Sequence, residues 1–305
     1  MRSEGIGILA GLGATAIWTG NFIAARALAD QIPPIQFNFW RWVVALIVIL
    51  PFGLKHLPKD WSYARNNFGY LSLMAILGVT LMNSFIYKAG QTTESLNMAL
   101  IMPFTPAAIV ILARFLYGEK ISWQRGIGIT IATAGIFILI CRGSWERLAS
   151  WRFQNGDFWT LGCMLCFALY SLFMRKRSRE VSNVGFNILV FALGIAYTSP
   201  LVVAELVVEP LPEFNYAAII GILYSGVGCS AMAFWLWTAA IDKLGPVKAG
   251  IIYYTLPFFA AIMANVVLGE KVTLAQGIGG LMIIFGVLSA TLRPRASRGR
   301  RASPN

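Results

Sequence analysis

Long apolar stretches alternate with short polar segments along almost the whole chain. Each stretch spans about 20 residues, which is the length that an α-helix needs to cross the hydrocarbon core of a bilayer. Ten of these stretches are predicted as transmembrane helices, at residues 6–29, 34–54, 67–90, 93–116, 122–141, 156–177, 182–208, 214–240, 246–268 and 273–292. The pattern therefore predicts an all-α polytopic membrane protein with ten transmembrane helices.

The apolar pattern is repeated within the chain at an offset of 151 residues. Pro106 returns as Pro257, and the turn Gly118-Glu119-Lys120-Ile121-Ser122 returns as Gly269-Glu270-Lys271-Val272-Thr273. A constant offset over most of the chain indicates two copies of one unit. We place the first copy at residues 5–142 and the second at 156–292, followed by a basic tail at 293–305 that we expect to be disordered.

Five helices per copy is an odd number, so the second copy must enter the membrane from the opposite side. Inverted repeats of this kind are typical of secondary transporters, in which the substrate binds near the middle of the membrane between the two halves. We expect a cavity that opens to one side at a time and is lined mainly by the first, third and fourth helices of each repeat. A channel, or a membrane scaffold without carrier activity, is the alternative.

The charged residues add information about the orientation of the protein in the membrane. Hydrophobic residues make up 57% of the sequence and charged residues 12%, with a mean hydropathy of +0.67 and a formal net charge of +12. Most of the lysines and arginines fall in the loops of one side and in the tail. The positive-inside rule therefore predicts that both termini are cytoplasmic. This accounts for the charge without a nucleic-acid partner, and the tail could contact anionic lipid.

Residue types that carry catalysis or bind metals are scarce. The single histidine, His56, lies in a loop, and the acidic residues fall mostly in predicted loops or at helix ends. Cys163 and Cys166 form a C-x-x-C pair inside an apolar stretch, where we expect packed thiols and no redox or metal site. We therefore expect no enzyme, no cofactor, no bound metal and no ATP-driven pump. Nothing in the pattern indicates an oligomeric state.

Two sets of motifs resemble a known family. The repeated proline, the Gly-Glu-Lys turn and the spaced glycines Gly126, Gly128, Gly277 and Gly279, where we expect close helix packing, resemble the EamA module of the drug/metabolite transporter superfamily. Ala16-Ile17-Trp18-Thr19-Gly20-Asn21-Phe22 resembles the start of that module, and Leu169-Tyr170-Ser171-Leu172-Phe173 replaces it in the second copy. The resemblance implies two tandem modules and a bacterial inner-membrane exporter of amino acids or other metabolites. The aromatic content is similar to that of the YddG-type amino-acid exporters.

Polar side chains inside apolar helices are the first candidates for a binding site, because they are costly to place in hydrocarbon. They are Asn21, Asn38, Arg41, Asn83 and Asn97, with Asn187 and Asn265 in the second copy. Each asparagine could instead serve a hydrogen bond between helices. Arg41 could bind a substrate carboxylate, or its side chain could extend to the outer interface of the membrane.

Aromatic side chains supply the second group of candidates, because a site for apolar solutes needs large flat surfaces. They are Trp18, Phe22, Phe85, Tyr87, Tyr170, Phe234, Trp235, Trp237, Tyr253 and Tyr254. We favour Trp18, Tyr170, Trp235 and Tyr254, because they lie deeper in their predicted helices. The alternative is a belt at the membrane interface, which the position of Tyr87 near a predicted helix end favours. Pro106 and Pro257 fall within predicted helices, where they could kink packed helices or mark helices broken at the site.

Together these candidates predict a small-molecule site for neutral and aromatic amino acids, in a protein whose other partner is membrane lipid. Aromatic rings bind apolar side chains, and asparagine can serve both an ammonium and a carboxylate because it donates and accepts hydrogen bonds. Other metabolites or drugs are the alternative substrates. Glu94 and Glu205 are the nearest candidates for a proton relay, but both lie near an interface, so we expect loose coupling or none.

Overall fold

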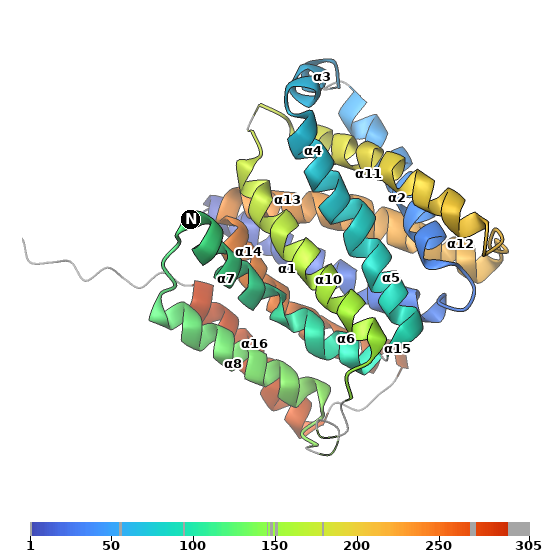
Figure 1. The fold of residues 1–305 in the computed structure, drawn as a ribbon. Helices are drawn as coiled ribbons and strands as arrows, with labels where there is room; N and C mark the ends of the chain where they lie inside the picture. Colours follow the sequence, from blue (N-terminus) through green and yellow to red (C-terminus); the bar gives the residue numbers. More distant parts are fainter. Residues whose placement is uncertain are drawn as a thin grey trace, which may run out of the picture.

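The protein is described here by a computed structural model that covers residues 2–54, 57–93, 95–144, 146, 149, 152–178, 180–268 and 273–291. The described part of the chain is helical throughout, and long helices lie side by side across the molecule (Figure 1). The basic tail at 293–305, the second Gly-Glu-Lys turn at 269–271, Glu94 and the side chain of Asn265 fall outside the described residues.

The helices of the first half follow the predicted stretches closely. They are α1 (Arg2–Ala27), α2 (Pro34–Gly53), α4 (Phe68–Ala75), the π-helix η2 (Ile76–Leu81), α5 (Met82–Thr92), α6 (Ser95–Ile101), the 3₁₀ turn η3 (Met102–Phe104), α7 (Thr105–Tyr117) and α8 (Trp123–Ile140). One short helix was not expected: α3 (Leu57–Asn66) occupies a segment that the sequence had suggested to be a loop. Its Asp60 is buried, and the Oδ2 atom accepts a hydrogen bond from Ser182 at 3.4 Å.

The second half repeats this order of helices. It comprises α10 (Asn155–Phe173), η4 (Met174–Lys176), α11 (Asn183–Leu206), α12 (Tyr216–Leu223), the π-helix η5 (Tyr224–Met232), α13 (Ala233–Leu244), α14 (Pro246–Ile252), the 3₁₀ turn η6 (Tyr253–Thr255), α15 (Leu256–Leu268) and α16 (Leu274–Thr291).

The irregular segments repeat as faithfully as the regular helices. The 3₁₀ turn at 102–104 returns at 253–255, and a π-helix ends at Leu81 in one half and at Met232 in the other, in each case 151 residues later. Pro106 and Pro257 lie in the first turn of α7 and α15, directly after these 3₁₀ turns. Proline fits there because the first turn of a helix leaves its N–H groups without intrahelical acceptors. Both prolines therefore mark a break between two helical segments.

The helices α8 and α16 join the two halves through reciprocal glycine contacts. A Cβ atom at Gly128 would lie 2.6 Å from the carbonyl oxygen of Gly286, and one at Gly135 would lie 2.7 Å from that of Gly279. Gly128 comes before Gly135 in α8, whereas its partner Gly286 comes after Gly279 in α16. The two helices are therefore antiparallel, as an inverted repeat requires. Close packing was therefore correctly expected at Gly128 and Gly279. The same expectation was wrong for Gly126 and Gly277, where a Cβ atom would meet nothing within 4 Å.

The tight turn after α7 also follows from glycine. Gly118 has φ +66°, and its N–H donates to the carbonyl of Arg114 at 3.0 Å, which closes the C-terminus of the helix. This left-handed conformation is costly for residues with a Cβ atom. The Gly-Glu-Lys segment in the first half is thus a helix stop.

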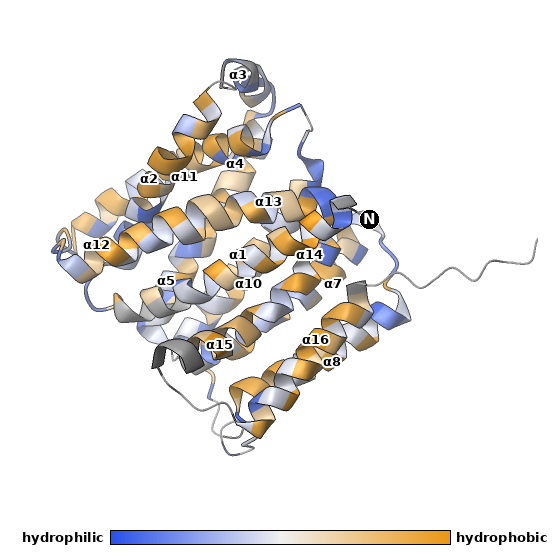
Figure 2. Ribbon diagram, turned by 180° about the vertical axis from the view of Figure 1, so that it is seen from behind, coloured by the Kyte–Doolittle hydropathy of each residue, from blue (hydrophilic) through white to orange (hydrophobic). Residues whose placement is uncertain are grey.

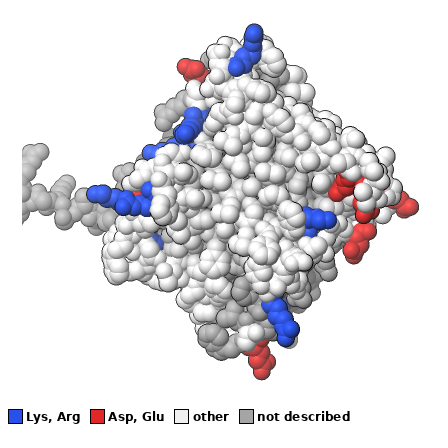
Figure 3. All heavy atoms as spheres, viewed as in Figure 1, with Lys and Arg blue, Asp and Glu red and all other residues white. Residues whose placement is uncertain are grey.

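Seven helical segments of the described chain are long and apolar enough to cross a membrane. They are Pro34–Gly53, Phe68–Thr92, Trp123–Ile140, Asn155–Lys176, Asn183–Leu206, Tyr216–Leu244 and Pro246–Met263, with two shorter apolar helices at Met102–Tyr117 and Leu274–Ala290. Apolar residues cover the long helices (Figure 2), and the charged side chains of the visible face gather mainly around its rim (Figure 3). The fold is that of a polytopic membrane protein, and the count of ten spans stays a prediction.

Candidate functional site

Arg41 lies inside the helix bundle with no exposed surface and is the one basic residue among the described ones that is buried. Its Nε donates to the hydroxyl of Ser230 at 2.7 Å, so the guanidinium joins α2 to the π-helix η5 of the other half. Its Nη1 donates to the amide oxygens of Asn21 and Asn83 at 3.0 and 3.1 Å, and also to the hydroxyl of Tyr87. We name Arg41, Asn21, Asn83, Tyr87 and Ser230 the polar cluster.

The polar cluster leaves the charge of Arg41 without a counter-ion. Within the described residues no carboxylate pairs with Arg41, whose guanidinium carbon lies 5.4 Å from the ring centre of Trp42 and 5.7 Å from that of Tyr87. Its Nη2 atom is buried and has no hydrogen-bond partner in the described structure. A desolvated charge is costly unless it is paired, and a buried donor without an acceptor adds to that cost. The arrangement is therefore suited to an anionic group of a ligand.

Both π-helices help to place this cluster. Asn83 Nδ2 donates to the carbonyl of Gly78 in η2 at 3.1 Å, and the hydroxyl of Ser230 donates to the carbonyl of Ser225 in η5 at 2.9 Å. A Cβ atom at Gly226 would lie 2.8 Å from the carbonyl oxygen of Arg41, so glycine lets α2 approach η5 closely enough for the contact with Ser230. π-Helical turns occur often at functional sites.

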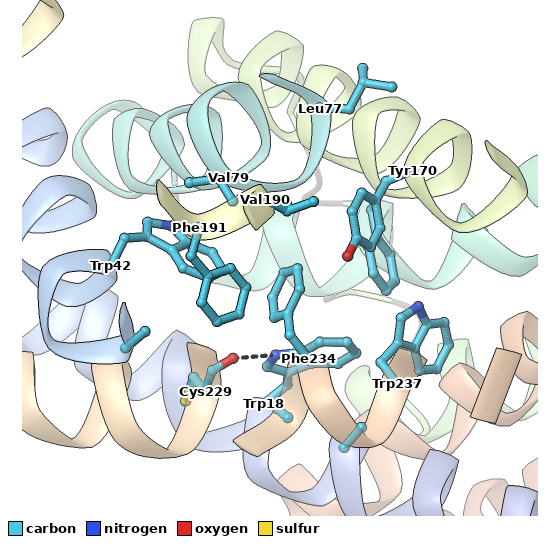
Figure 4. Packing of buried hydrophobic residues seen from close by; sticks show 14 of the residues in the cluster. Trp18, Trp42, Leu77, Val79, Tyr170, Val190, Phe191, Cys229, Phe234 and Trp237 are labelled. Carbon is cyan, nitrogen blue, oxygen red and sulfur yellow. Dashed lines mark hydrogen bonds between the residues drawn. The ribbon is translucent and has the colours of Figure 1, made fainter. Parts of the chain in front are cut away.

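Aromatic rings pack together near the centre of the bundle, among them Trp18, Phe234 and Trp237 (Figure 4). The ring of Trp18 lies 5.4 Å from that of Phe167 and 5.3 Å from that of Trp237, and Phe167 lies 5.1 Å from Tyr253. The indole N–H of Trp18 donates to the carbonyl of Cys229 at 2.8 Å, which fixes the ring against η5. All of these rings except Trp18 come from the second half, whereas the amides and the guanidinium come from the first.

A cavity of about 40 Å³ lies between the polar cluster and the aromatic rings. It is lined by Trp18, Asn21, Arg41, Met82, Asn83, Ile86, Met102, Cys163, Phe167 and Tyr253. One water molecule in the liquid takes up about 30 Å³, so this space is too small for a metabolite. The structure therefore shows the central cavity in a contracted form, and a ligand could enter only if helices of the two halves moved apart.

A much larger vestibule, of about 1230 Å³, opens at the end of the bundle where the chain begins. Its lining includes six basic residues, Lys120, Arg125, Arg175, Arg177, Lys243 and Lys248, and two acidic ones, Glu119 and Asp242. Glu119 accepts from Arg175 at 2.5 Å, and Asp242 pairs with Arg177. The vestibule is therefore positively charged.

The opposite end of the bundle is closed by a hydrogen-bond cluster around Asp157. This buried carboxylate caps the start of α10 and accepts from Thr93 Oγ1 at 2.6 Å and from Asn97 Nδ2 at 2.8 Å. Nearby on the same side, Glu205 accepts from the backbone N–H groups of Ile35 and Gln36 at the start of α2. These carboxylates hold helix ends together, and Asn97 belongs to this closure and not to the cavity.

The residues singled out in the sequence thus divide between the centre and other places. Trp18, Asn21, Arg41 and Asn83 line the cavity, and Tyr87 contacts Arg41 directly. Arg41 does not reach the interface in this structure. Asn38 instead donates to backbone carbonyls of Val79 and Thr80, which fixes α2 against the neighbouring π-helix.

Three predicted aromatic candidates lie away from the cavity. Tyr170 is buried beside Gly78, where a Cβ atom would lie 2.5 Å from its ring. The hydroxyl of Tyr254 lies 3.1 Å from that of Thr133, in a separate apolar cluster around α8 and α16. Trp235 is 42% exposed on the outside of α13.

Several residues of the centre were missed in the sequence. Met82, Ile86, Met102, Cys163 and Phe167 are apolar or aromatic residues in apolar helices, so nothing in their type sets them apart. Tyr253 was an aromatic candidate but not one of the preferred ones. Ser230 gave a weak signal, because it lies in a run of small residues from Ser225 to Ala231. Small residues of this kind let helices approach closely in membranes.

The comparisons with known proteins agree with the fold. The model of the EamA-like transporter family matches the chain twice, at residues 5–141 and 154–292. The chain belongs to the EamA-like transporter family. One relative, an uncharacterized transporter of Archaeoglobus fulgidus, is 26% identical over 91% of this chain and 94% of its own. The uncharacterized transporter YyaM of Bacillus subtilis is 24% identical over 90% of each chain.

More distant relatives share the same architecture. A WAT1-related protein of Arabidopsis thaliana is 24% identical over 88% of this chain and 81% of its own. A solved crystal structure with 18% identity matches 93% of this chain and 96% of its own with a TM-score of 0.74, which supports the fold alone. As an EamA-like transporter, the protein is a multi-pass membrane transporter of the drug/metabolite type, and the names of these relatives do not specify a substrate.

Proposed function

We propose that this EamA-like transporter is a secondary carrier that exports small organic solutes by alternating access, with neutral and aromatic amino acids as its substrates. The observation that carries this proposal is the central cavity, which lies between the two halves and combines an unpaired guanidinium with a wall of aromatic rings. Such a site can hold the carboxylate of a ligand at Arg41 and its apolar body against Trp18 and Phe167.

The ends of the bundle support alternating access. The vestibule reaches the bundle from one end only, whereas the Asp157 cluster closes the other end. The halves at 5–142 and 156–292 would move relative to each other about the α8–α16 contact, which is symmetric and tightly packed. A channel would need a continuous aqueous path, and in the described structure the contracted cavity interrupts it.

The distribution of charge supports export as the direction of transport. If the positive-inside rule holds, the basic vestibule faces the cytoplasm of a bacterial cell and both termini lie on that side of the inner membrane. Substrates would then enter from the cytoplasm, which is the geometry of an exporter. A carrier role without an enzymatic step is supported by the two matches of the EamA-like transporter family to this chain.

A counterflow experiment in proteoliposomes tests this function. Vesicles loaded with unlabelled phenylalanine should accumulate labelled phenylalanine transiently, because a carrier exchanges substrates through one site. Trp18→Ala should reduce this exchange about tenfold, because loss of the buried ring removes contact worth about 1.5–3 kcal/mol. Trp235→Ala is the matched control, since that ring lies outside the bundle. Saturable flux without counterflow, or equal loss in both variants, would contradict a carrier with this site.

A further inference from the structure

We propose that the central site selects organic anions with one carboxylate and an aromatic body over zwitterionic amino acids of the same size. This inference rests on the proposed carrier function and its site, but it replaces amino acids by aromatic monocarboxylates as the preferred substrates. It follows from the distribution of hydrogen-bond donors and acceptors around the cavity, and a second, separate observation in the vestibule supports it.

The acceptor atoms around Arg41 are already engaged within the protein. Nη1 of Arg41 donates hydrogen bonds to the amide oxygens of Asn21 and Asn83. The hydroxyl of Tyr87 donates to the same oxygen of Asn21 at 3.0 Å. Rotating either amide would place its NH₂ group against the guanidinium, donor against donor. Asn21 Oδ1 therefore has both of its lone pairs engaged. Asn83 Oδ1 has one lone pair engaged by the guanidinium, so a ligand ammonium could use the other only beside the protein's own cation.

The guanidinium, in contrast, has capacity left for an anion. Arg41 lines the cavity, and its buried Nη2 has no partner among the described residues. A carboxylate there would supply both the missing acceptor and the missing counter-charge. Arg41 is also the only charged residue in the described lining, so an ammonium beside it would meet a like charge with no carboxylate to offset it.

The aromatic rings do not replace a carboxylate as partners of an ammonium. A cation binds best over an open ring face. The rings of Trp18 and Phe167 meet at 90°, and Trp18 and Phe234 meet at 81°, so the edge of one ring covers the face of its neighbour. The two rings of the lining, Trp18 and Phe167, offer apolar surface that suits the ring of a substrate.

The vestibule provides the independent support. Its lining carries six basic residues against two acidic ones, and both acidic side chains are in ion pairs with vestibule arginines. Lys248 pairs with Glu4, so the excess of positive charge comes from Lys120, Arg125 and Lys243. A hollow lined by one sign of charge raises the local concentration of the opposite sign and depletes its own. Organic anions would therefore be concentrated at this entrance, while a zwitterion would gain no net attraction.

Two helices connect the vestibule to the cavity. On α10, Met174 next to its C-terminus lines the vestibule and Phe167 lines the cavity, which places the two about 10 Å apart along the helix axis. On α13, Ile241 lines the vestibule, and Trp237 lies one turn deeper, against Trp18. The floor of the vestibule thus lies about two helical turns from the aromatic rings that line the cavity. An anion in the vestibule must pass these rings to reach Arg41.

Matched ligands test this selectivity. Phenylalanine, 3-phenylpropionate and 2-phenylethylamine share one aromatic body and differ only in the presence of carboxylate and ammonium. Thermal stabilisation of the purified transporter in detergent should require about tenfold less 3-phenylpropionate than phenylalanine, and 2-phenylethylamine should not stabilise it. The permanently charged 3-phenylpropanesulfonate should compete with 3-phenylpropionate, since it offers the same anionic oxygens and does not leak across bilayers.

The flux arm uses the difference in net charge. In proteoliposomes with a potassium diffusion potential, uptake of 3-phenylpropanesulfonate should rise when the interior is positive, whereas exchange of zwitterionic phenylalanine should not respond. Arg41→Gln should abolish the anion preference, and Asn187→Ala should retain it because Asn187 lies outside the cavity. If phenylalanine binds as tightly as 3-phenylpropionate and shows counterflow, the anion inference fails and the carrier function stands. If no ligand stabilises the protein or is exchanged, both fail.

Discussion

The two halves of the molecule share a backbone but differ in chemistry. Helix breaks, π-helices and the glycines between α8 and α16 recur at an offset of 151 residues. The polar cluster does not recur, because the positions that correspond to its members in the second half are Leu172, Ala192, Phe234 and Thr238, against Asn21, Arg41, Asn83 and Tyr87 in the first. One half therefore contributes the polar wall of the cavity, and the other contributes most of the aromatic wall.

This difference distinguishes the residue positions that determine the fold from those that determine the binding site. Positions that must be small, or must break a helix, are constrained in both halves because they set how the helices meet. Positions that face the cavity are free to differ because the proposed substrates have two unlike ends. Predictions can therefore be directed at the shared positions, which should affect folding, or at the divergent ones, which should affect transport.

The largest effect is expected at the shared glycines. Gly128→Leu should destabilise the protein by more than about 3 kcal/mol or prevent folding, because the side chain would collide with the backbone of α16 and cannot be relieved by rotamer changes. Gly126→Leu, two residues away on the same helix, should be tolerated, since a Cβ atom there meets open space. The measurement is the thermal unfolding temperature in detergent. Equal destabilisation by both variants would contradict the proposed helix contact.

The next effect is expected at a divergent position. Asn21→Leu gives the first half the residue that the second half carries at Leu172. It removes the acceptor that Arg41 Nη1 and Tyr87 share, so transport should fall about tenfold, in keeping with a cost of about 1–3 kcal/mol for an unsatisfied buried donor. Initial rates of uptake, compared with those of Asn187→Ala, provide the check. Unchanged transport in Asn21→Leu would show that the polar cluster has no part in binding.

The fold was largely predictable from the sequence, and the site only in part. Apolar stretches and the repeat predicted the helices, because burial in lipid demands long apolar runs. Buried polar residues such as Arg41 and Asn83 were predictable as candidates because they are costly in hydrocarbon. Which of two neighbouring aromatic residues faces the centre was not predictable.

The reason lies in the irregular helices. The π-helix η5 precedes α13, and its wider turns change the direction in which the following residues point. The sequence favoured Trp235 because it lies deeper in its predicted helix, whereas Trp237 is the ring that lies against Trp18. The 3₁₀ turn η6 has the same consequence, so Tyr253 lines the cavity in place of Tyr254. A 3.6-residue period cannot anticipate either shift.

A smaller effect is expected at the closed end of the bundle. Asp157→Asn keeps the volume of the side chain but weakens its hydrogen bonds to Thr93 and Asn97 and its capping of α10. Loss of a cap costs about 1 kcal/mol, which should favour opening at this end and raise the rate of exchange a few-fold while lowering the unfolding temperature slightly. A slower rate with unchanged stability would show that Asp157 acts in transport by another route.

The smallest effect is expected in the vestibule. Replacing Lys120 and Arg125 by Gln should raise the substrate concentration for half-maximal anion uptake two- to threefold at low salt. The effect should disappear near 1 M salt, where charges are screened within about 3 Å. An effect that persists at high salt would indicate a direct contact with substrate in place of attraction at a distance.

The central claim is that substrate occupies the cavity between the halves, and Cys163 provides the most direct test because it lines that cavity and is buried. In a variant that keeps only this cysteine, a polar thiol reagent should modify it from either side of oriented vesicles, depending on the state of the carrier, and bound substrate should slow the reaction at least tenfold. Modification that is equally fast with and without substrate, in protein that still transports, would contradict a binding site at this position.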